Sequence, residues 1–490
     1  MKKYIVHVVV LLSVCTLDGQ QYNTILNFKD ECSSLMENLK VGDAIYTIGV
    51  GICPTNECGY FAKYDLNGKV EWMREYPQID INSRQVMLYR DHHFYITGKA
   101  QDSVATKTLV LDTLGNVLNE WNYSVEGATT NFSKEVIYDE DYYYFVLTEV
   151  VDGDTRGALY KCDYTGNLVE RIVLPILIFT TPVSLRNYQE NLLISINHRF
   201  EESCPFGLNG ISPGATYLAE VDKETMTILR DKKDVCYRFV SNDMYTSPTS
   251  EILRTVILRD SMPIGTDGNF GFIRYDDYWE VEDVKEYPHD FTKAITNLKY
   301  TNDGQYYYTI QTENVPQTDG SIWPFSDLLI QKWTAGHELL WEKRYTSHKK
   351  MKRLNGLNFT FDEDGNLHIV GFIDPDFPNT EKKDFWLFSV DADGCFNGDC
   401  SDVIDLDDLV NLEEGVSIVD EAVAYPNPVR DVLFLKNIPS QTHVKVMDVM
   451  GQVIYETPYN SPQGLNLEYL ASGVYFIKLG NNRTLRILKH

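Results

Sequence analysis

A strand–turn–strand segment that returns about every fifty residues is the feature that most constrains how this chain can fold. In its first copy, residues 61–76 (FAKYDLNGKVEWMREY), the turn falls at Asp65–Gly68. Asn and Gly tolerate the positive φ that tight turns require, and Val70 and Trp72 then restore an apolar face at period two. Six later segments repeat the pattern, and their turns begin at Asp112, Asp163, Asp222, Asp276, Trp333 and Asp391.

Further strands fill the residues between these copies. Short runs rich in aromatic and β-branched residues, ending near Gly, Thr or Asn, occupy most intervals: 43–51, 92–100, 141–149, 190–198, 304–312 and 365–373. Each period therefore contains about four short strands, which is the content of one β-propeller blade. The sequence shows no amphipathic helical stretch within the period, and this argues against helical repeats.

Seven copies of this unit predict an all-β fold, a seven-bladed β-propeller over residues 21–400. The alternative is a pair of β-sandwiches in which Asp-Gly and Asn-Gly hairpin turns recur by accident. Two aromatic clusters, Tyr142–Tyr144 and Tyr306–Tyr308, are candidates for stacking on sugars, although packing between blades is the commoner use of such residues.

Several copies share Asp, Gly and Trp at a similar spacing. The residues are Asp65, Gly68 and Trp72 in the first copy, Asp112, Gly115 and Trp121 in the second, and Gly336 and Trp341 in the sixth. They resemble the short repeats of bacterial pyrroloquinoline-quinone-like propellers, and we interpret the tryptophans as packing residues between blades. The chain lacks the vicinal cysteine pair of quinoprotein dehydrogenases, so the resemblance is to the repeat and gives little support to a quinone cofactor.

The charge of the chain excludes some classes of partner. Its formal net charge is −27 at pH 7, with a pI of about 4.7. Such a surface repels phosphate backbones and anionic lipid, so we expect no nucleic-acid binding. The charge fits a soluble exported protein, or one that gathers cations.

The first twenty residues read as a signal peptide. Lys2 and Lys3 form the charged region, an apolar run spans 5–14, and cleavage is expected near residues 19–21. Anchoring as a lipoprotein through Cys15 is the minor alternative, because the residue before it is a valine. The apolar run is too short to span a bilayer, and we expect no transmembrane segment after it.

Eight cysteines remain once the leader is removed, and an even number favours disulfides in an exported chain. The expected pairs are Cys53–Cys58, Cys395–Cys400 and Cys204–Cys236, and elimination leaves Cys32–Cys162. A zinc–thiolate site is not expected, because the close Cys-x-x-Cys spacing that it needs is absent.

The composition changes after Cys400. Residues 401–422 are rich in Asp and Glu and have no hairpin rhythm, so we predict an acidic linker. Short alternating strands resume over residues 423–490, a length that can form a small immunoglobulin-like β-sandwich.

Four motifs occur in order within residues 423–490. They are YPNPVRDVLFL (425–435) with Pro426, Asn427 and Pro428, DVMGQVI (448–454) with Gly451, LASGVYFIKL (470–479) with Gly473 and Tyr475, and the basic end RILKH (486–490). These motifs resemble the C-terminal sorting domain of type IX secretion substrates from Bacteroidetes. The resemblance implies export through the periplasm and the outer-membrane translocon. It also implies removal of the domain by a sortase, leaving the protein secreted or at the cell surface.

The best metal candidate is a short acidic loop. Asp391, Asp393, Asn397 and Asp399 place hard oxygen ligands close together in sequence, as calcium prefers. The loop lacks the terminal Glu of an EF-hand, and a hairpin turn followed by a disulfide loop explains the same residues. Calcium is therefore the one cofactor that we consider, and the sequence assigns no catalytic residue.

Two functions from different classes fit this chain. The first is a non-catalytic binding or adhesion module outside the cell, with a glycan or a surface protein as its ligand. The second is a secreted hydrolase or lyase that acts on polysaccharide or peptide at the mouth of the propeller. An enzyme of this kind should bring buried carboxylates together at the channel, whereas a binding module need not.

Overall fold

The computed structural model describes the chain in segments, and structural statements below refer to these. The described residues are 21–26, 34–52, 57–81, 86–101, 105–124, 128–151, 154–177, 182–199, 214–233, 239–247, 252–258, 269–287, 293–301, 303–315, 325–347, 353–374, 383–407, 411–413, 423–425, 428–436, 443–449, 451–459, 464–479 and 484–489. The expected signal peptide, residues 1–20, lies outside them. Within the described part, no helix has the length and apolarity that a membrane crossing requires.

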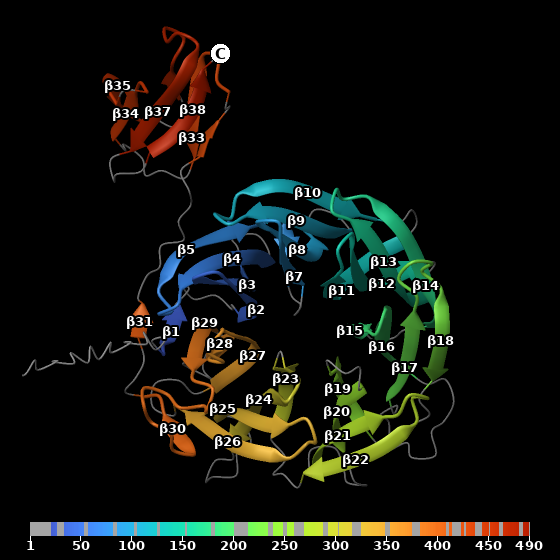
Figure 1. Ribbon diagram of the computed structural model, residues 1–490. Helices are drawn as coiled ribbons and strands as arrows, with labels where there is room; N and C mark the ends of the chain where they lie inside the picture. Colours follow the sequence, from blue (N-terminus) through green and yellow to red (C-terminus); the bar gives the residue numbers. More distant parts are fainter. Residues whose placement is uncertain are drawn as a thin grey trace, which may run out of the picture. The chain divides into compact units, whose positions relative to one another are not determined.

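The described strands of the first compact unit form seven antiparallel groups of four, which we number blade 1 to blade 7 (Figure 1). Blade 1 contains β2 (Ser34–Val41), β3 (Ala44–Ile52), β4 (Glu57–Asp65) and β5 (Val70–Tyr76). Blade 2 contains β7 (Met87–Arg90), β8 (His93–Ala100), β9 (Thr106–Asp112) and β10 (Val117–Tyr123), with the short β6 (Ile79–Asp80) beside β8. Blade 3 contains β11 (Ala128–Tyr138), β12 (Tyr142–Val151), β13 (Asp154–Asp163) and β14 (Leu168–Leu177).

The later blades repeat this order. Blade 4 contains β15 (Pro182–Tyr188), β16 (Asn191–Arg199), β17 (Gly214–Val221) and β18 (Ile228–Lys233). Blade 5 contains β19 (Phe239–Thr246), β20 (Ile252–Leu258), β21 (Asn269–Tyr275) and β22 (Val281–Tyr287). Blade 6 contains β23 (Lys293–Tyr300), β24 (Tyr306–Val315), β25 (Phe325–Thr334) and β26 (Leu339–Thr346). Blade 7 contains β27 (Arg353–Phe361), β28 (Leu367–Asp374) and β29 (Asp384–Val390), and β1 (Asn23–Leu26) is its fourth strand.

The blades stand around a common centre, with the first strand of each blade innermost (Figure 1). The ring closes where β1, from the start of the chain, pairs antiparallel with β29 and sets Ile25 opposite Trp386. The all-β propeller class that the sequence predicts is therefore confirmed. The N-terminal strand that completes blade 7 was not part of that prediction.

The turn that follows the third strand of each blade recurs with one backbone feature, a residue of positive φ. These residues are Gly68, Gly115, Gly166, Met226, Trp279, His337 and Gly394. In the first turn, the carboxylate of Asp65 accepts hydrogen bonds from the amides of Asn67 and Lys69, each at 2.9 Å. An aspartate at this position fixes the turn without help from the rest of the fold.

The carbonyl oxygen of this positive-φ residue ties its blade to the preceding one, a contact that we call the interblade staple. Tyrosine hydroxyls on the outer strands donate to it: Tyr76 to Gly115 at 2.6 Å, Tyr123 to Gly166 at 3.4 Å and Tyr345 to Gly394 at 2.5 Å. Lysine ammoniums take the same role for two other blades, from Lys232 to Trp279 and from Lys285 to His337. At the ring closure, Thr24 Oγ1 donates to the carbonyl of Gly68 at 3.0 Å.

The size of the residue at the turn is complementary to the side chain that packs against it from the preceding blade. A Cβ added at Gly166 would lie 2.3 Å from the ring of Trp121, and one at Gly394 would lie 2.8 Å from Trp341. These contacts agree with the interpretation of both tryptophans as packing residues between blades. In blade 5 the tryptophan lies in the turn itself. The turn residue is Trp279, and the guanidinium of Arg230 from the preceding blade lies 4.0 Å from the centroid of its ring.

Residues 401–413 differ from the linker that the sequence predicts, because part of them packs on the propeller. We call Ser401–Glu413 the strap. Its β30 (Val403–Asp405) pairs parallel with β26, and its β31 (Asn411–Glu413) pairs parallel with β1. Two apolar residues hidden in this acidic stretch, Ile404 and Leu406, are fully buried. The first compact unit accordingly extends to Gly415.

The second compact unit contains the C-terminal strands, which form two small sheets. One sheet contains β32 (Val423–Tyr425), β33 (Val432–Lys436) and β36 (Leu465–Asn466). The other contains β34 (His443–Met447), β35 (Val453–Pro458), β37 (Gly473–Leu479) and β38 (Thr484–Lys489). Their shared core includes Val429, Leu433, Val446 and Ile477, all fully buried, so the predicted small β-sandwich is present.

The structure contains the expected disulfide between Cys395 and Cys400, and Cys58 is also disulfide-bonded. The expected partner Cys53 and the pair Cys204 and Cys236 lie outside the described residues. The pairing of Cys32 with Cys162, reached by elimination, is wrong, because Cys162 is a free thiol buried in the apolar core of blade 3.

Substitution of the strap's apolar anchor tests its role in the propeller. We expect Ile404→Ala to lower the free energy of unfolding by about 3 kcal/mol, because it removes a fully buried side chain. The neighbouring Val403 is 57% exposed, and Val403→Ala should change the stability by no more than about 0.5 kcal/mol. Urea unfolding of the two variants measures the difference, and equal midpoints would show that the strap does not support the ring.

Candidate functional site

The innermost strands carry a repeated irregularity at the centre of the ring. A register shift interrupts six of them in the described part of the chain, namely β2, β11, β15, β19, β23 and β27. The residue that follows the shift is polar in each case: Glu37, Glu135, Ser184, Asp243, Asn297 and Asn358. A bulge re-aims side chains, and an innermost strand is the edge of its sheet, where backbone amides lack a neighbouring strand.

Two of these polar side chains satisfy the backbone of the next innermost strand. Glu37 is buried, and its Oε2 accepts hydrogen bonds from the amides of Val86 at 2.7 Å and Met87 at 3.0 Å. Glu135 accepts a hydrogen bond from the amide of Leu185 at 2.5 Å and also binds the guanidinium of Arg186. Both carboxylates are therefore committed to structural hydrogen bonds.

In three consecutive blades, the residue two positions after the polar residue at the bulge is basic or aromatic. These are Arg186 on β15, Tyr245 on β19 and Lys299 on β23, which pair with Leu193, Leu253 and Tyr308 of their second strands. We call Arg186, Tyr245 and Lys299 the inner basic arc. The equivalent residues of the other blades are Leu39, Leu88, Ile137 and Thr360, so the basic residues at this position come from blades 4 and 6.

The arc is held in place at Arg186. Its guanidinium binds Glu135, donates to the carbonyl of Leu185 at 2.8 Å and lies 5.4 Å from the ring centroid of Tyr245. A charge-assisted pair combined with a cation–π contact restricts the side chain to one orientation.

Lys299 is held differently. Its Nζ lies 5.6 Å from the ring centroid of Phe359, and it makes no hydrogen bond or ion pair with any residue that the structure describes. Burial lowers the pKa of Lys299 to about 8, whereas the charge of Glu37 raises it and that of Arg186 lowers it further. The side chain nevertheless keeps some exposed surface. Together these facts describe a partly buried lysine whose ammonium has no bonded partner among the described residues.

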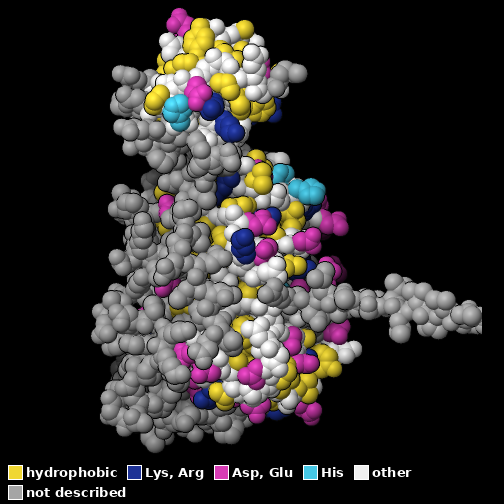
Figure 2. Space-filling view, turned by 90° about the vertical axis from the view of Figure 1, so that its left-hand side faces the viewer, with side chains coloured by type: hydrophobic (Ala, Val, Ile, Leu, Met, Phe, Trp, Pro, Cys, Tyr) yellow, Lys and Arg dark blue, Asp and Glu magenta, His cyan; other side chains and the backbone are white. Residues whose placement is uncertain are grey.

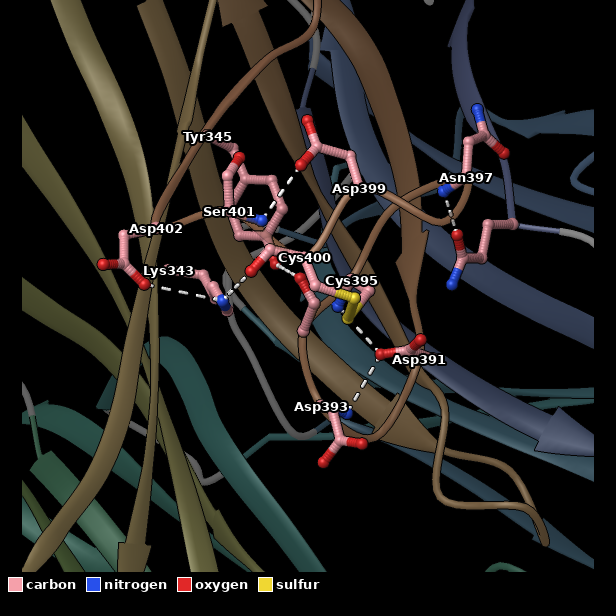
Figure 3. Close-up of a disulfide and its surroundings, with 12 residues drawn as sticks. Lys343, Tyr345, Asp391, Asp393, Cys395, Asn397, Asp399, Cys400, Ser401 and Asp402 are labelled. Atoms are coloured by element: carbon pink, nitrogen blue, oxygen red, sulfur yellow. Dashed lines mark hydrogen bonds and ion pairs between the residues drawn. A yellow bond between two sulfur atoms is a disulfide. The ribbon is translucent and has the colours of Figure 1, made fainter.

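The acidic loop proposed for calcium has a different arrangement (Figure 3). Asp391 accepts hydrogen bonds from the amides of Asp393 at 3.0 Å and Cys395 at 2.8 Å, and Asp399 accepts one from the amide of Ser401 at 2.9 Å. The amide of Asn397 donates to the side chain of Gln21. The side chains of Asp391, Asp393 and Asp399 point in different directions (Figure 3).

This loop serves the junction between blades 6 and 7. Lys343 Nζ donates to the carbonyl of Cys400 and lies 3.6 Å from Asp402, while Tyr345 reaches Gly394 (Figure 3). Hydrogen bonding from Ser401 lowers the pKa of Asp399, so this carboxylate caps a turn. Among the described residues, no group of three or more His, Cys, Asp or Glu is arranged to hold a metal ion. Calcium binding stays an untested prediction.

The tyrosine clusters pack within and between the blades. Tyr143, Tyr144, Tyr307 and Tyr308 are all buried, and Tyr143 and Tyr307 stack near Trp121 and Trp333 respectively. Sequence reasoning missed the inner basic arc instead, because a bulge shifts the alternation by one residue. A signal was present in the polar residue that precedes Arg186 and Lys299 by two positions.

The C-terminal motifs meet within the second unit. The amide of Val429, next to Pro428, donates to the carbonyl of Leu488 on the terminal strand at 2.8 Å. Gly451 has a φ of 80° in a turn led by Asp448, and Tyr475 on β37 donates its hydroxyl to Ala471 at 2.9 Å. Pro426 and Asn427 lie outside the described residues.

Residues 423–489 match the family described as the secretion system C-terminal sorting domain. This chain is a type IX secretion substrate. The type IX machinery therefore delivers it to the cell surface or the extracellular space, as the sequence predicts. The match covers the terminal domain and leaves the activity of the propeller open. A search of curated proteins returned no match to the chain.

Solved structures with a similar fold include proteins of several kinds. A puromycin-hydrolyzing peptidase from Mycobacterium tuberculosis has 11% identity and a TM-score of 0.47, over 84% of this chain and 58% of that one. The polysaccharide lyase Uly1 has 10% identity and a TM-score of 0.45, over 78% of this chain and 94% of that one. A member of the DUF4221 family from Bacteroides vulgatus has 10% identity and a TM-score of 0.37, over 76% and 96%. These likenesses carry no argument about activity.

The unpaired ammonium of Lys299 should cost the propeller stability in a pH-dependent way. Its pKa falls from 10.5 to about 8 in the folded chain, so folding disfavours the charged form. The cost is fully present below pH 8 and disappears as the pH rises to 10.5. We expect Lys299→Met to be more stable than the parent at pH 7 by up to about 3 kcal/mol, with the difference shrinking between pH 8 and 10.5.

Urea unfolding across this pH range measures the effect. Lys69 is exposed in the turn of blade 1, and Lys69→Met provides the matched control, with no change expected. A Lys299→Met variant that is less stable at pH 7, or a difference that does not vary with pH, would contradict this account.

Proposed function

We propose that this type IX substrate is a non-catalytic binding or adhesion protein that offers the inner wall of its propeller to a ligand outside the cell. One observation carries the proposal. Glu37 and Glu135, the carboxylates with defined contacts on the innermost strands, already accept backbone amide hydrogen bonds. The wall thus combines committed carboxylates with the available ammonium of Lys299.

The alternative, a secreted hydrolase or lyase acting on polysaccharide or peptide, needs different groups. Glycoside hydrolysis uses one carboxylic acid that gives up a proton and a second carboxylate that attacks or activates water. Hydrogen bonds from amides favour the ionised form of a carboxylate, which does not suit the proton donor that such an enzyme needs. The contacts of Glu37 and Glu135 therefore favour binding over catalysis.

The outer surface suits a protein that works outside the cell. On the face drawn in Figure 2, Asp and Glu side chains are spread over the described residues, with apolar side chains between them. This distribution agrees with the net charge of −27 and favours solubility after export. We expect a glycan or another surface protein as the ligand, and the sortase as the enzyme that removes the C-terminal domain.

A ligand screen with a test for turnover decides between the two functions. We expect the purified secreted protein to retain at least one member of a glycan and peptide array, and to leave it chemically intact after prolonged incubation. Mass spectrometry of the eluted ligand detects cleavage, with calcium added in a parallel series. Repeated turnover of a retained ligand would establish the enzyme and refute the binding proposal.

A further inference from the structure

We infer that the inner basic arc is a binding site for a carboxylate group carried by the ligand. This inference deepens the proposed function and rests on it, because it names the chemical class that a binding propeller would take. The arc consists of Arg186, Tyr245 and Lys299, one side chain from each of blades 4, 5 and 6.

The register concentrates these side chains on one side of the wall. Each of the three follows the polar residue at the bulge of its strand by two positions. They therefore occupy equivalent positions along the innermost strands of neighbouring blades. The same position in blades 1, 2 and 3 holds Leu39, Leu88 and Ile137. Basic residues therefore occupy this position in blades 4 and 6, and aliphatic residues occupy it in blades 1, 2 and 3.

Besides burial, the charges of Glu37 and Arg186 act on the pKa of Lys299, and the effect of Glu37 is the larger of the two. Arg186 lowers the pKa of Lys299, which is the sign expected for repulsion between like charges. Glu37 opposes this effect, but its carboxylate is bonded to two amides and makes no ion pair with the ammonium within 4 Å among the described contacts.

No carboxylate among the described residues forms an ion pair with Lys299. Glu135 pairs with Arg186, and Glu37, whose charge raises the pKa of Lys299, accepts hydrogen bonds from the amides of Val86 and Met87. The ammonium of Lys299 remains as the one charge of the arc without a bonded counter-charge among the described residues. An ammonium on blade 6 and a guanidinium at the equivalent position of blade 4 suit a carboxylate, which accepts hydrogen bonds on two oxygens.

The test compares one acidic sugar, one free organic acid and one neutral sugar. Isothermal titration calorimetry of the secreted protein would use trigalacturonate, succinate and galactotriose as probes. We expect trigalacturonate to bind, and Lys299→Gln to weaken this binding at least tenfold. Lys299→Arg keeps the charge and should stay within threefold of the parent, and the exposed Lys69→Gln should match the parent.

The remaining outcomes separate the inference from the proposed function. Succinate binding with the same dependence on Lys299 would support the site and identify a free organic acid as its ligand. Failure of both acids to bind, or acid binding that Lys299→Gln leaves intact, would overturn the inference. Binding of galactotriose alone would overturn it while the proposed binding function stands. Turnover of trigalacturonate with the tenfold loss in Lys299→Gln would support the site and refute the non-catalytic role.

Discussion

The propeller depends on one backbone interaction, the hydrogen bond into the carbonyl of a turn residue with positive φ. A left-handed residue turns its carbonyl away from its own hairpin, and the outer strand of the preceding blade supplies the donor. The donor is a tyrosine, a lysine or a threonine, and the turn residue changes with it from Gly to Trp or His. Neighbouring blades thus keep one geometry although their side chains differ.

This geometry sets what the centre of the ring can do. Because each blade is fixed against the next at its outer strand, the innermost strands present equivalent positions to the axis (Figure 1). Bulges there aim polar side chains at the unpaired edge of the neighbouring strand, and Glu37 and Glu135 are used in this way. The position two residues further on holds Arg186, which is paired with Glu135, and Lys299, which has no bonded partner among the described residues and can serve a ligand.

The sequence predicts the parts that depend on local chemistry. The turn led by Asp65 and Gly68 needs only its own residues, so its repetition predicted the propeller, and the terminal motifs predicted the sorting domain. Long-range features escaped prediction. β1 is four residues long and pairs with β29 at the far end of the propeller, and acidic neighbours conceal the buried Ile404 and Leu406 of the strap. The pairing of Cys162 that was reached by elimination is wrong, because an even number of cysteines says nothing about which cysteines lie close together in the fold.

The interblade staple can be measured directly by urea unfolding of Tyr345→Phe. The substitution keeps the buried ring and removes the hydroxyl that donates to Gly394, leaving a buried carbonyl without this donor. The account predicts a loss of about 1 kcal/mol in the free energy of unfolding, and no loss for Tyr278→Phe, whose side chain is 82% exposed. An unchanged unfolding midpoint for Tyr345→Phe would contradict the claim that these hydrogen bonds hold the ring together.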